Sequence, residues 1–336
     1  MMVSRQKGIA LITALLIVTL ATIAAVSITA ELQREIRRSG NILQHDQAYV
    51  YAIAAEDFAR YGLKLDFDDN KTDHLYELWH TIPVAEDIQG GALEGKLDDL
   101  QGLFNLNSLA NNKALDKDRF ERILRNLDVA PAEIQQITAA LLDWLDADQI
   151  SQPAYGAEDD YYLGLAEPQK PHLAANQLLS SLSELRLIKG FNDEILTKLR
   201  IKPAYEAVTG ELLEPVFTVL PEASTSININ TAPVEVLKSL DIKITDTIAQ
   251  DIITKRQGDA LNNGSARPFK SVDEFKSYLD SLSVPAVDIA SLSVATDYFS
   301  LKAKVLVGNS NLYLSSLIKR ESTGLSNVIS RNQGAN

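Results

Sequence analysis

An uncharged apolar segment near the N-terminus most constrains what this chain can fold into. The segment runs for 22 residues, from Ile9 to Ala30, and follows the basic residues Arg5 and Lys7. An α-helix rises about 1.5 Å per residue, so the segment is about 33 Å long as a helix. This length matches the hydrocarbon core of a bilayer, and the preceding basic residues favour a cytoplasmic N-terminus. The sequence therefore predicts a single transmembrane helix over residues 9–30.

A glycine stands immediately before this apolar segment. The junction Lys7-Gly8-Ile9-Ala10-Leu11-Ile12-Thr13 resembles the leader junction of type IV pilins and type II secretion pseudopilins. The resemblance implies a leader over residues 1–8, cleavage by a prepilin peptidase between Gly8 and Ile9, and methylation of the new N-terminus at Ile9. A secretory signal cleaved near Ala30 and an uncleaved signal anchor are two other interpretations of the same pattern.

The fifth residue after this junction is Thr13. Most members of the resembling family carry a glutamate there, which is thought to pair with the N-terminal amine of a neighbouring subunit. A carboxylate in a lipid-like environment needs such a partner, because an unpaired buried charge is costly. A subunit with no neighbour above it has no use for the glutamate, so Thr13 indicates a position at the filament tip. Simple divergence or a misread start site would leave the same residue.

The remainder of the chain is large and acidic. With 336 residues, it has room for two compact domains beyond the apolar segment. The formal net charge is −13, and loss of Arg5 and Lys7 with a leader leaves 30 basic against 45 acidic side chains. Such a surface repels nucleic acid and suits cations. There is no cysteine, which excludes disulfides, thiol catalysis and cysteine-ligated metals, and the four histidines lack zinc-site spacing.

The pattern of apolar residues predicts an α+β fold. A long amphipathic helix continues from Glu31 to about Leu65, and its second half is expected to pack on a small antiparallel sheet. Alternation predicts strands within residues 90–107 and a C-terminal hairpin over Tyr298–Leu317, with its turn at Gly308–Asn311. Helices are expected between these strand regions, over residues 116–127, 131–146, 183–187, 193–200, 234–240, 246–255 and 271–282.

These elements divide the chain into a pilin-like core and an inserted domain. The core comprises residues 31–108 and 290–320, and residues 109–289 form the large α-helical insertion. Residues 321–336 are polar and are predicted to be a flexible tail. An ordinary pilin has no room for so many helices, whereas a large helical insertion is typical of K-type minor pseudopilins.

Five segments carry a resemblance to the general secretion pathway protein K family of type II secretion. They are Phe104–Asn107, Leu142–Asp148, Ala157–Tyr162, Ser183–Gly190 and Ile229–Pro233. The resemblance implies a non-enzymatic minor pseudopilin at the tip of the pseudopilus, which initiates assembly with the I- and J-type minor pseudopilins and the major pseudopilin for export of folded proteins across the outer membrane. It also implies a single-pass inner-membrane anchor with the C-terminal domain in the periplasm.

Repeated asparagines raise an alternative function. Phe104–Leu109 and Ile227–Ala232 share an apolar-Asn-apolar-Asn pattern, in which the asparagines are expected to form turns or caps. The second of these segments and Ser183–Phe191 also resemble helix-hairpin-helix entries, which bind DNA phosphates through backbone amides. This alternative is a membrane-anchored binding module for DNA or a ligand in a competence or type IV pilus system. The acidic charge and the lack of glycines over Leu240–Ile244 favour a helical packing unit instead.

The acidic segment Leu141–Tyr162 is the strongest candidate for a binding site. Asp146 and Asp148 follow a helix, and a loop containing Pro153 and Gly156 brings back a second acidic cluster. Calcium takes about 6–8 oxygen ligands from carboxylates and carbonyls, and the resembling family has calcium sites in its helical domain. A solvated acidic loop is the alternative, and nothing in the sequence supports glycosidase-like catalysis. The predicted ligands of a structural Ca²⁺ are Asp146, Asp148, Glu158, Asp159 and Asp160.

Overall fold

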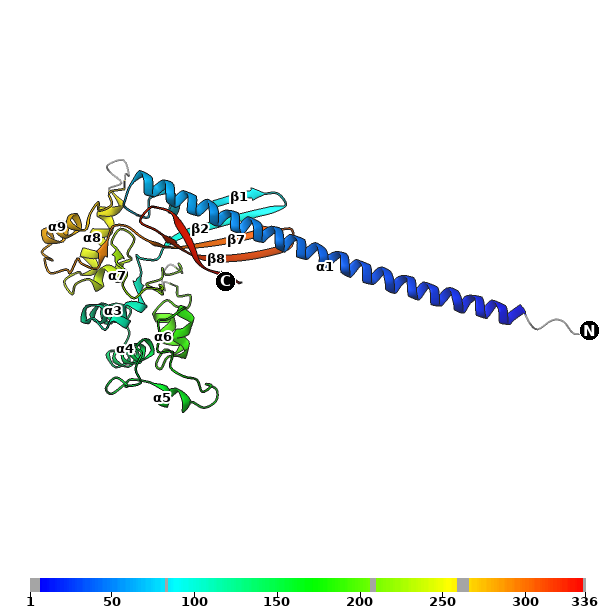
Figure 1. Cartoon of the computed structure of the whole chain (residues 1–336), viewed down its shortest axis with the longest axis horizontal. Coiled ribbons are helices and arrows are strands. Elements are labelled where there is room, and N and C mark those ends of the chain that lie inside the picture. The colour runs from blue at the N-terminus through cyan, green and yellow to red at the C-terminus, as the bar shows by residue number, and fades with distance from the viewer. Residues whose placement is uncertain (1–6, 82–83, 206–209, 259–265, 335–336) are drawn as a thin grey trace, which may run out of the picture.

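The computed structural model describes residues 7–81, 84–205, 210–258 and 266–334. One long helix, α1, projects well beyond a sheet and a group of short helices (Figure 1). It spans Lys7–Asp69, which is 63 residues and about 95 Å of helix. The expected fold class is confirmed: a long N-terminal helix packs on an antiparallel sheet, and a helical domain is inserted into the sheet.

The N-terminal part of α1 is long and apolar enough to cross a membrane. Its apolar side chains are exposed along the whole segment from Ile9 to Leu32. Thr19, Thr22 and Ser27 donate their hydroxyl hydrogens to the carbonyl four residues earlier, at 2.7–2.9 Å. Hydroxyls bonded within their own helix suit the interior of a bilayer, where water is absent. Residues 1–6 of the predicted leader lie outside the described residues.

The C-terminal half of α1 packs on a five-stranded antiparallel sheet with strand order β1-β2-β7-β8-β9 (Figure 1). The helix meets the sheet through Ala48, Ala52 and Ala55, which recur at helical spacing and are at most 4% exposed. These small side chains let α1 approach Leu93 and Val305 closely. The strands are Val84–Ile88 (β1), Gly91–Asp99 (β2), Tyr298–Val307 (β7), Ser310–Arg320 (β8) and Ser326–Gln333 (β9). The hairpin of β7 and β8 confirms the predicted C-terminal hairpin.

The C-terminal residues contradict the prediction of a flexible tail. They form the edge strand β9, which pairs with β8, and only residues 335 and 336 lie outside the described chain. Arg331 donates through Nε and Nη2 to the carboxylate of Glu56 on α1, at 2.8 and 2.7 Å. Burial pushes the pKa of Glu56 up, but hydrogen bonds from Arg331 and Ser316 outweigh burial and hold it below its usual value. This ion pair ties β9 to a residue 275 positions away, which local composition could not indicate.

The helical domain interrupts the chain between β2 and β7 and lies at the end of α1 opposite its apolar segment (Figure 1). Each predicted helix is confirmed within two residues at either end. They are α3 (Ala114–Asn126), α4 (Pro131–Leu145), η2 (Leu182–Leu187), α6 (Asp193–Lys198), α7 (Val234–Ser239), α8 (Asp246–Gln257) and α9 (Val272–Ser281). The structure adds the short helices α2 (Leu78–Thr81), η1 (Leu106–Asn111) and α5 (Asp159–Leu163).

The repeated asparagine pattern marks two similarly built parts of the helical domain. Each begins with a two-residue strand in a parallel pair: β3 (Phe104–Asn105) with β4 (Phe217–Thr218), and β5 (Ile227–Asn228) with β6 (Leu292–Ser293). Asn107 exchanges two hydrogen bonds with the backbone of Leu179, at 2.9 and 2.8 Å. Asn230 does the same with Phe269, at 3.0 and 2.9 Å. The first asparagine of each pattern makes the local bond predicted for a turn or cap, since Asn105 and Asn228 accept from the backbone amides two residues later, at 3.1 and 3.0 Å. The second asparagine clamps a distant extended segment, which the sequence pattern did not predict.

A buried polar junction connects the helical domain to the sheet. The side-chain nitrogen Nδ2 of Asn228 donates to the carboxylate of Asp99, the backbone carbonyl of Asp73 and the hydroxyl of Thr296, each at 3.0 Å. Asp99 ends β2, where the chain leaves the sheet, and Thr296 shortly precedes β7, where it returns. The carboxylate of Asp73 in turn accepts from Thr296 and from Arg320 at the end of β8. Asn228 thus holds both crossing points of the chain together.

Arg331→Ala should destabilise the fold, because it removes two charge-assisted hydrogen bonds from the buried carboxylate of Glu56. The expected loss is about 1–3 kcal/mol. It can be measured by chemical unfolding of the full chain in a nonionic detergent. Ser330→Ala, at an exposed neighbouring position of β9, should leave the unfolding free energy unchanged. Equal stabilities for Arg331→Ala and the unmodified chain would contradict the role given to this ion pair.

Candidate functional site

Three of the five predicted calcium ligands meet beyond the C-terminal end of α4. Carboxylate oxygens of Asp146, Asp148 and Glu158 lie within 4.8 Å of one another. Oxygens that bind one Ca²⁺ at about 2.3–2.6 Å are at most about 5 Å apart, so the spacing fits this ion. Asp146 is the C-cap residue of α4 and Glu158 is the N-cap residue of α5. Helix ends therefore fix two of the three carboxylates.

The carboxylate of Glu158 is buried without donors. The residue is 4% exposed, and neither of its oxygens has a hydrogen-bond partner among the described residues. Oδ1 of Asp146 is also buried and has no hydrogen-bond partner among the described residues. Burial, followed by repulsion from Asp143, Asp146 and Asp148, raises the pKa of Glu158 to about 7. Buried carboxylates without partners are costly, and a divalent cation would supply the partner that these oxygens lack.

Asp143 organises the loop that returns Glu158 to Asp146. Its side chain is fully buried and accepts from the backbone amides of Gln152 at 3.0 Å and Ala157 at 2.6 Å. Burial raises the pKa of Asp143, and these two amides counteract the rise. A Cβ atom at Gly156 would lie 2.3 Å from Oδ2 of Asp143, so this close approach requires glycine. Sequence reasoning counted Asp143 among the acids but missed this organising role.

The other two predicted ligands, Asp159 and Asp160, do not join the group of three. Asp159 accepts from the backbone amide of Ala174 at 2.9 Å, and Asp160 is exposed in the first turn of α5. The structure offers another oxygen that sequence reasoning missed. Nδ2 of Asn176 donates to the carbonyl of Asp148 at 3.3 Å, while its Oδ1 is buried without a partner in the described chain. No motif marks Asn176, because only the fold brings it beside the acidic loop.

A second group of carboxylates among the described residues, Asp66, Asp73 and Glu77, is of a different kind. Nη2 of Arg320 forms an ion pair with Asp73, and Nη1 lies 3.8 Å from Asp66. Glu77 accepts from Nε1 of Trp79 at 2.7 Å. Burial and the neighbouring carboxylates raise the pKa of Asp66 to about 7. The arginine already supplies the cation here, so this group is an internal ion-pair network that joins β8 to the end of α1.

The hairpin at Lys189-Gly190 packs against α4. Gly190 has φ +90°, and a Cβ atom there would lie 2.9 Å from Cγ2 of Ile137. The amides of Phe191 and Asn192 donate to backbone carbonyls within the hairpin, at 3.2 and 3.0 Å. These amides are therefore engaged internally, which favours the packing interpretation over phosphate binding.

The predicted processing site lies in the first turn of α1 as described, between Gly8 and Ile9. Oγ1 of Thr13 donates to the carbonyls of Ile9 and Ala10, at 3.1 and 3.0 Å. The hydroxyl is thus bonded within its own helix, and the position presents no charge to a neighbouring molecule.

The two parts of the helical domain match known protein-family models. Both models are described as type II secretion system (T2SS), protein K, and they match residues 102–203 and 227–297. The type II secretion system protein K of Aeromonas hydrophila is 32% identical over 94% of this chain and 93% of that protein. The protein of the same name from Pseudomonas aeruginosa is 33% identical over 98% of this chain and 93% of that protein.

A solved structure shares this fold over most of the chain. It is that of the GspK-GspI-GspJ complex from the type 2 secretion system of enterotoxigenic Escherichia coli. The matching chain is 26% identical in sequence, and its superposition has a TM-score of 0.73. The match covers 89% of this chain and 100% of that chain. The fold and these matches define a minor pseudopilin, a structural component of type II secretion. The chain belongs to the type II secretion system protein K family.

In the presence of a chelator, the full chain should lose stability as the pH rises from about 4.5 to about 7. Over this window the folded state holds a proton on Glu158 that the unfolded state, with a usual pKa of 4.5, has released. The folded state then binds more protons, so the free energy of unfolding falls with pH. Glu158→Gln should reduce this slope, as measured by chemical unfolding at several pH values.

Asp160→Asn provides the matched control, because it removes one exposed carboxylate from the same segment. It should keep the slope of the unmodified chain. Other buried carboxylates, among them Asp66 and Asp99, also have raised pKa values, so part of the slope should remain in Glu158→Gln. Identical slopes for Glu158→Gln and Asp160→Asn would show that Glu158 is not the titrating group.

Proposed function

We propose that this chain occupies the tip of the type II secretion pseudopilus and initiates its assembly, for export of folded proteins across the outer membrane. The observation that carries this proposal is the position of the helical domain, at the end of α1 opposite the apolar segment (Figure 1). Another subunit stacked above the pilin-like core would have to occupy this region. Thr13, which is uncharged and bonded within α1, supports the same position because it offers no carboxylate to a subunit above.

The partners proposed for this tip are the I- and J-type minor pseudopilins, with the major pseudopilin below them. The related structure is a GspK-GspI-GspJ complex, and its matching chain is covered over its full length. The exposed apolar part of α1 is available for the membrane and for the helices of such partners. The alternative, a DNA-binding module of a competence or type IV pilus system, has less support, because the hairpin amides are engaged internally.

The tip position predicts that one copy of this subunit ends each filament. Overexpression of this chain alone, in cells with an intact prepilin peptidase, should yield no filaments detectable by electron microscopy of sheared surface fractions. Co-expression with the major and the other minor pseudopilins should yield filaments that contain this chain at trace level. Long filaments composed of this subunit alone would contradict the proposal.

We also propose that residues 9–30 cross the inner membrane once, with the C-terminal domain in the periplasm. The basic residues Arg5 and Lys7 before the apolar segment favour a cytoplasmic N-terminus. A prepilin peptidase then cuts between Gly8 and Ile9, and Ile9 becomes the methylated N-terminus.

Processing predicts a mature chain that starts at Ile9. N-terminal sequencing and mass spectrometry of the membrane-extracted protein should find N-methylated Ile9. Gly8→Leu should block cleavage, because it puts a bulky side chain immediately before the scissile bond. Ala10→Leu, two residues beyond Gly8, serves as the control and should still be cut. An intact Met1 terminus or a start near Glu31 would overturn this assignment.

A structural Ca²⁺ is the proposed ligand of the acidic loop, held by Asp146, Asp148 and Glu158 with the buried oxygen of Asn176 nearby. The support comes from the spacing of the three carboxylates and from the buried oxygens that lack donors. The ion would join the end of α4 to the start of α5 and lower the repulsion within the loop. It would stabilise the fold by RT ln(1 + [L]/Kd), or about 2.7 kcal/mol at 100-fold excess over Kd.

The full chain should therefore melt at a lower temperature in chelator than in calcium. Asp148→Ala and Glu158→Ala should abolish most of this difference, because each removes a carboxylate from the group of three. Asp160→Asn, an exposed neighbour outside the group, should preserve it, and so should Glu133→Ala at the start of α4. Differential scanning calorimetry gives the measurement. Coincident melting curves with and without calcium would leave only a solvated acidic loop.

A further inference from the structure

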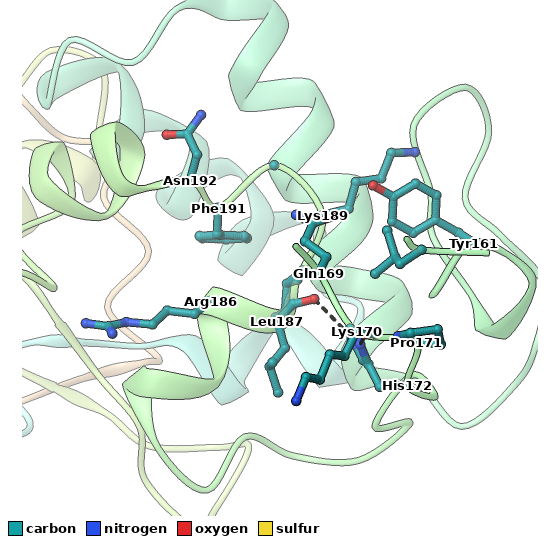
Figure 2. Close-up of a pocket in the computed structure, with 13 residues that line it drawn as sticks. Tyr161, Gln169, Lys170, Pro171, His172, Arg186, Leu187, Lys189, Phe191 and Asn192 are labelled. Carbon is teal, nitrogen blue, oxygen red and sulfur yellow. Dashed lines mark hydrogen bonds between the residues drawn. The ribbon is translucent and has the colours of Figure 1, made fainter. Parts of the chain in front are cut away.

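A pocket opens on the helical domain beside η2 and α6 (Figure 2). It has a volume of about 420 Å³ and is formed by α5, the segment that follows it and the Arg186–Asn192 stretch. None of the roles described above uses its interior. In Figure 1 this part of the domain lies far from the apolar end of α1, so a bilayer that holds α1 does not reach the pocket.

The charge of this pocket is opposite to that of the chain. The protein has a formal net charge of −13, yet the described residues that line the pocket include no aspartate or glutamate. They do include Lys170, Arg186 and Lys189, together with His172. A local surplus of positive charge on an acidic protein attracts anionic groups selectively, because the rest of the surface repels them.

Two of these cations are available to a ligand. Lys189 is already engaged, since its Nζ donates to the carbonyls of Tyr155 and Gly156 at 3.2 and 3.1 Å. The side chains of Lys170 and Arg186 are exposed, and neither makes a hydrogen bond or ion pair within the described chain. Asp193 contributes a favourable charge near Arg186 but is itself paired with Lys202 at 2.6 Å.

Apolar surface lies between these two cations. Leu187 stands between Arg186 and Lys170 in Figure 2 and is 50% exposed, although it belongs to a well-formed helical turn. Phe191 also lines the pocket and is almost fully buried. The pocket therefore presents the exposed side chain of Leu187 to a ligand, with an exposed cationic side chain on each side. Burial of such surface contributes about 25 cal/mol per Å².

Aromatic contacts support one wall of the pocket. The ring of His172 packs on Tyr162 and Trp144, with centroids 4.9 and 6.0 Å apart. Nζ of Lys189 lies 4.6 Å from the centroid of the Tyr161 ring. A preformed wall means that a ligand loses little free energy in ordering the protein.

We propose that this pocket binds a peptide segment of a partner protein in which an apolar side chain is flanked by carboxylates. The apolar side chain covers Leu187 and Phe191, and the carboxylates pair with Lys170 and Arg186. Nucleic acid fits poorly, because its extended phosphate backbone would meet the acidic surface around the pocket. This inference is independent of the tip position and of calcium binding.

The test uses the full chain in a nonionic detergent with calcium held constant. Fluorescence anisotropy follows binding of a fluorescein-labelled peptide, Gly-Glu-Glu-Leu-Glu-Glu-Gly. The expected result is saturable binding that weakens as salt rises. Replacing the glutamates of the peptide by glutamine, or its leucine by serine, should weaken binding about fivefold or more. Lys170→Glu, Arg186→Glu and Leu187→Ser should weaken it to a similar degree.

Lys117→Glu makes the same charge change at an exposed position of α3 and should leave the affinity within about twofold of the unmodified chain. Thermal unfolding of each variant establishes that it is folded. The proposal is overturned if no saturable binding occurs up to about 1 mM peptide, if the glutamine peptide binds equally well, or if Lys117→Glu weakens binding as much as Arg186→Glu. Displacement of the peptide by an equal concentration of inorganic phosphate would identify a simple anion site and would also overturn it.

Discussion

The buried hydrogen bonds of Asn228 decide how the two halves of this molecule sit on each other. The apolar cores of the pilin-like part and of the helical domain are separate clusters, so nonspecific burial does not orient them. The amide of Asn228 instead bonds to Asp73, Asp99 and Thr296, which lie where the chain leaves and re-enters the sheet. Buried polar groups must be satisfied in one geometry, and this requirement fixes the helical domain at the end of α1.

The two groups of carboxylates differ in whether an arginine lies beside them. At the junction, Arg320 supplies a positive charge to Asp73 and Asp66, although Oδ1 of Asp73 and Oδ2 of Asp66 are buried without hydrogen-bond partners among the described residues. At the acidic loop, Asp143 is satisfied by backbone amides, whereas Glu158 and one oxygen of Asp146 are not. Burying carboxylate oxygens without hydrogen-bond partners costs free energy, and a bound cation would lower that cost. Arg320 thus distinguishes the two groups, and this is why a cation site is proposed at the acidic loop alone.

Lys189 links the acidic loop to the pocket beside it. Its ammonium group donates to two carbonyls of the loop and lies over the ring of Tyr161, which lines the pocket. Asp159 holds the following segment through the amide of Ala174. Order in the loop and the shape of the pocket therefore rest on common contacts. A pseudopilin that ends a filament would present this part of the helical domain far from the membrane.

The sequence by itself determined the apolar anchor, the order of the elements and the helices of the insertion, because each follows from local periodicity, capping and chain length. It also identified the acidic loop, since Asp146, Asp148 and Glu158 lie within one short segment. Only the tertiary structure decided that Asp159 and Asp160 stand outside the carboxylate group and that Asn176 stands beside it. It also decided that the polar C-terminus is a strand, because the partner that holds it, Glu56, lies 275 residues away. Contacts between distant residues depend on the packed fold, and no local pattern encodes them.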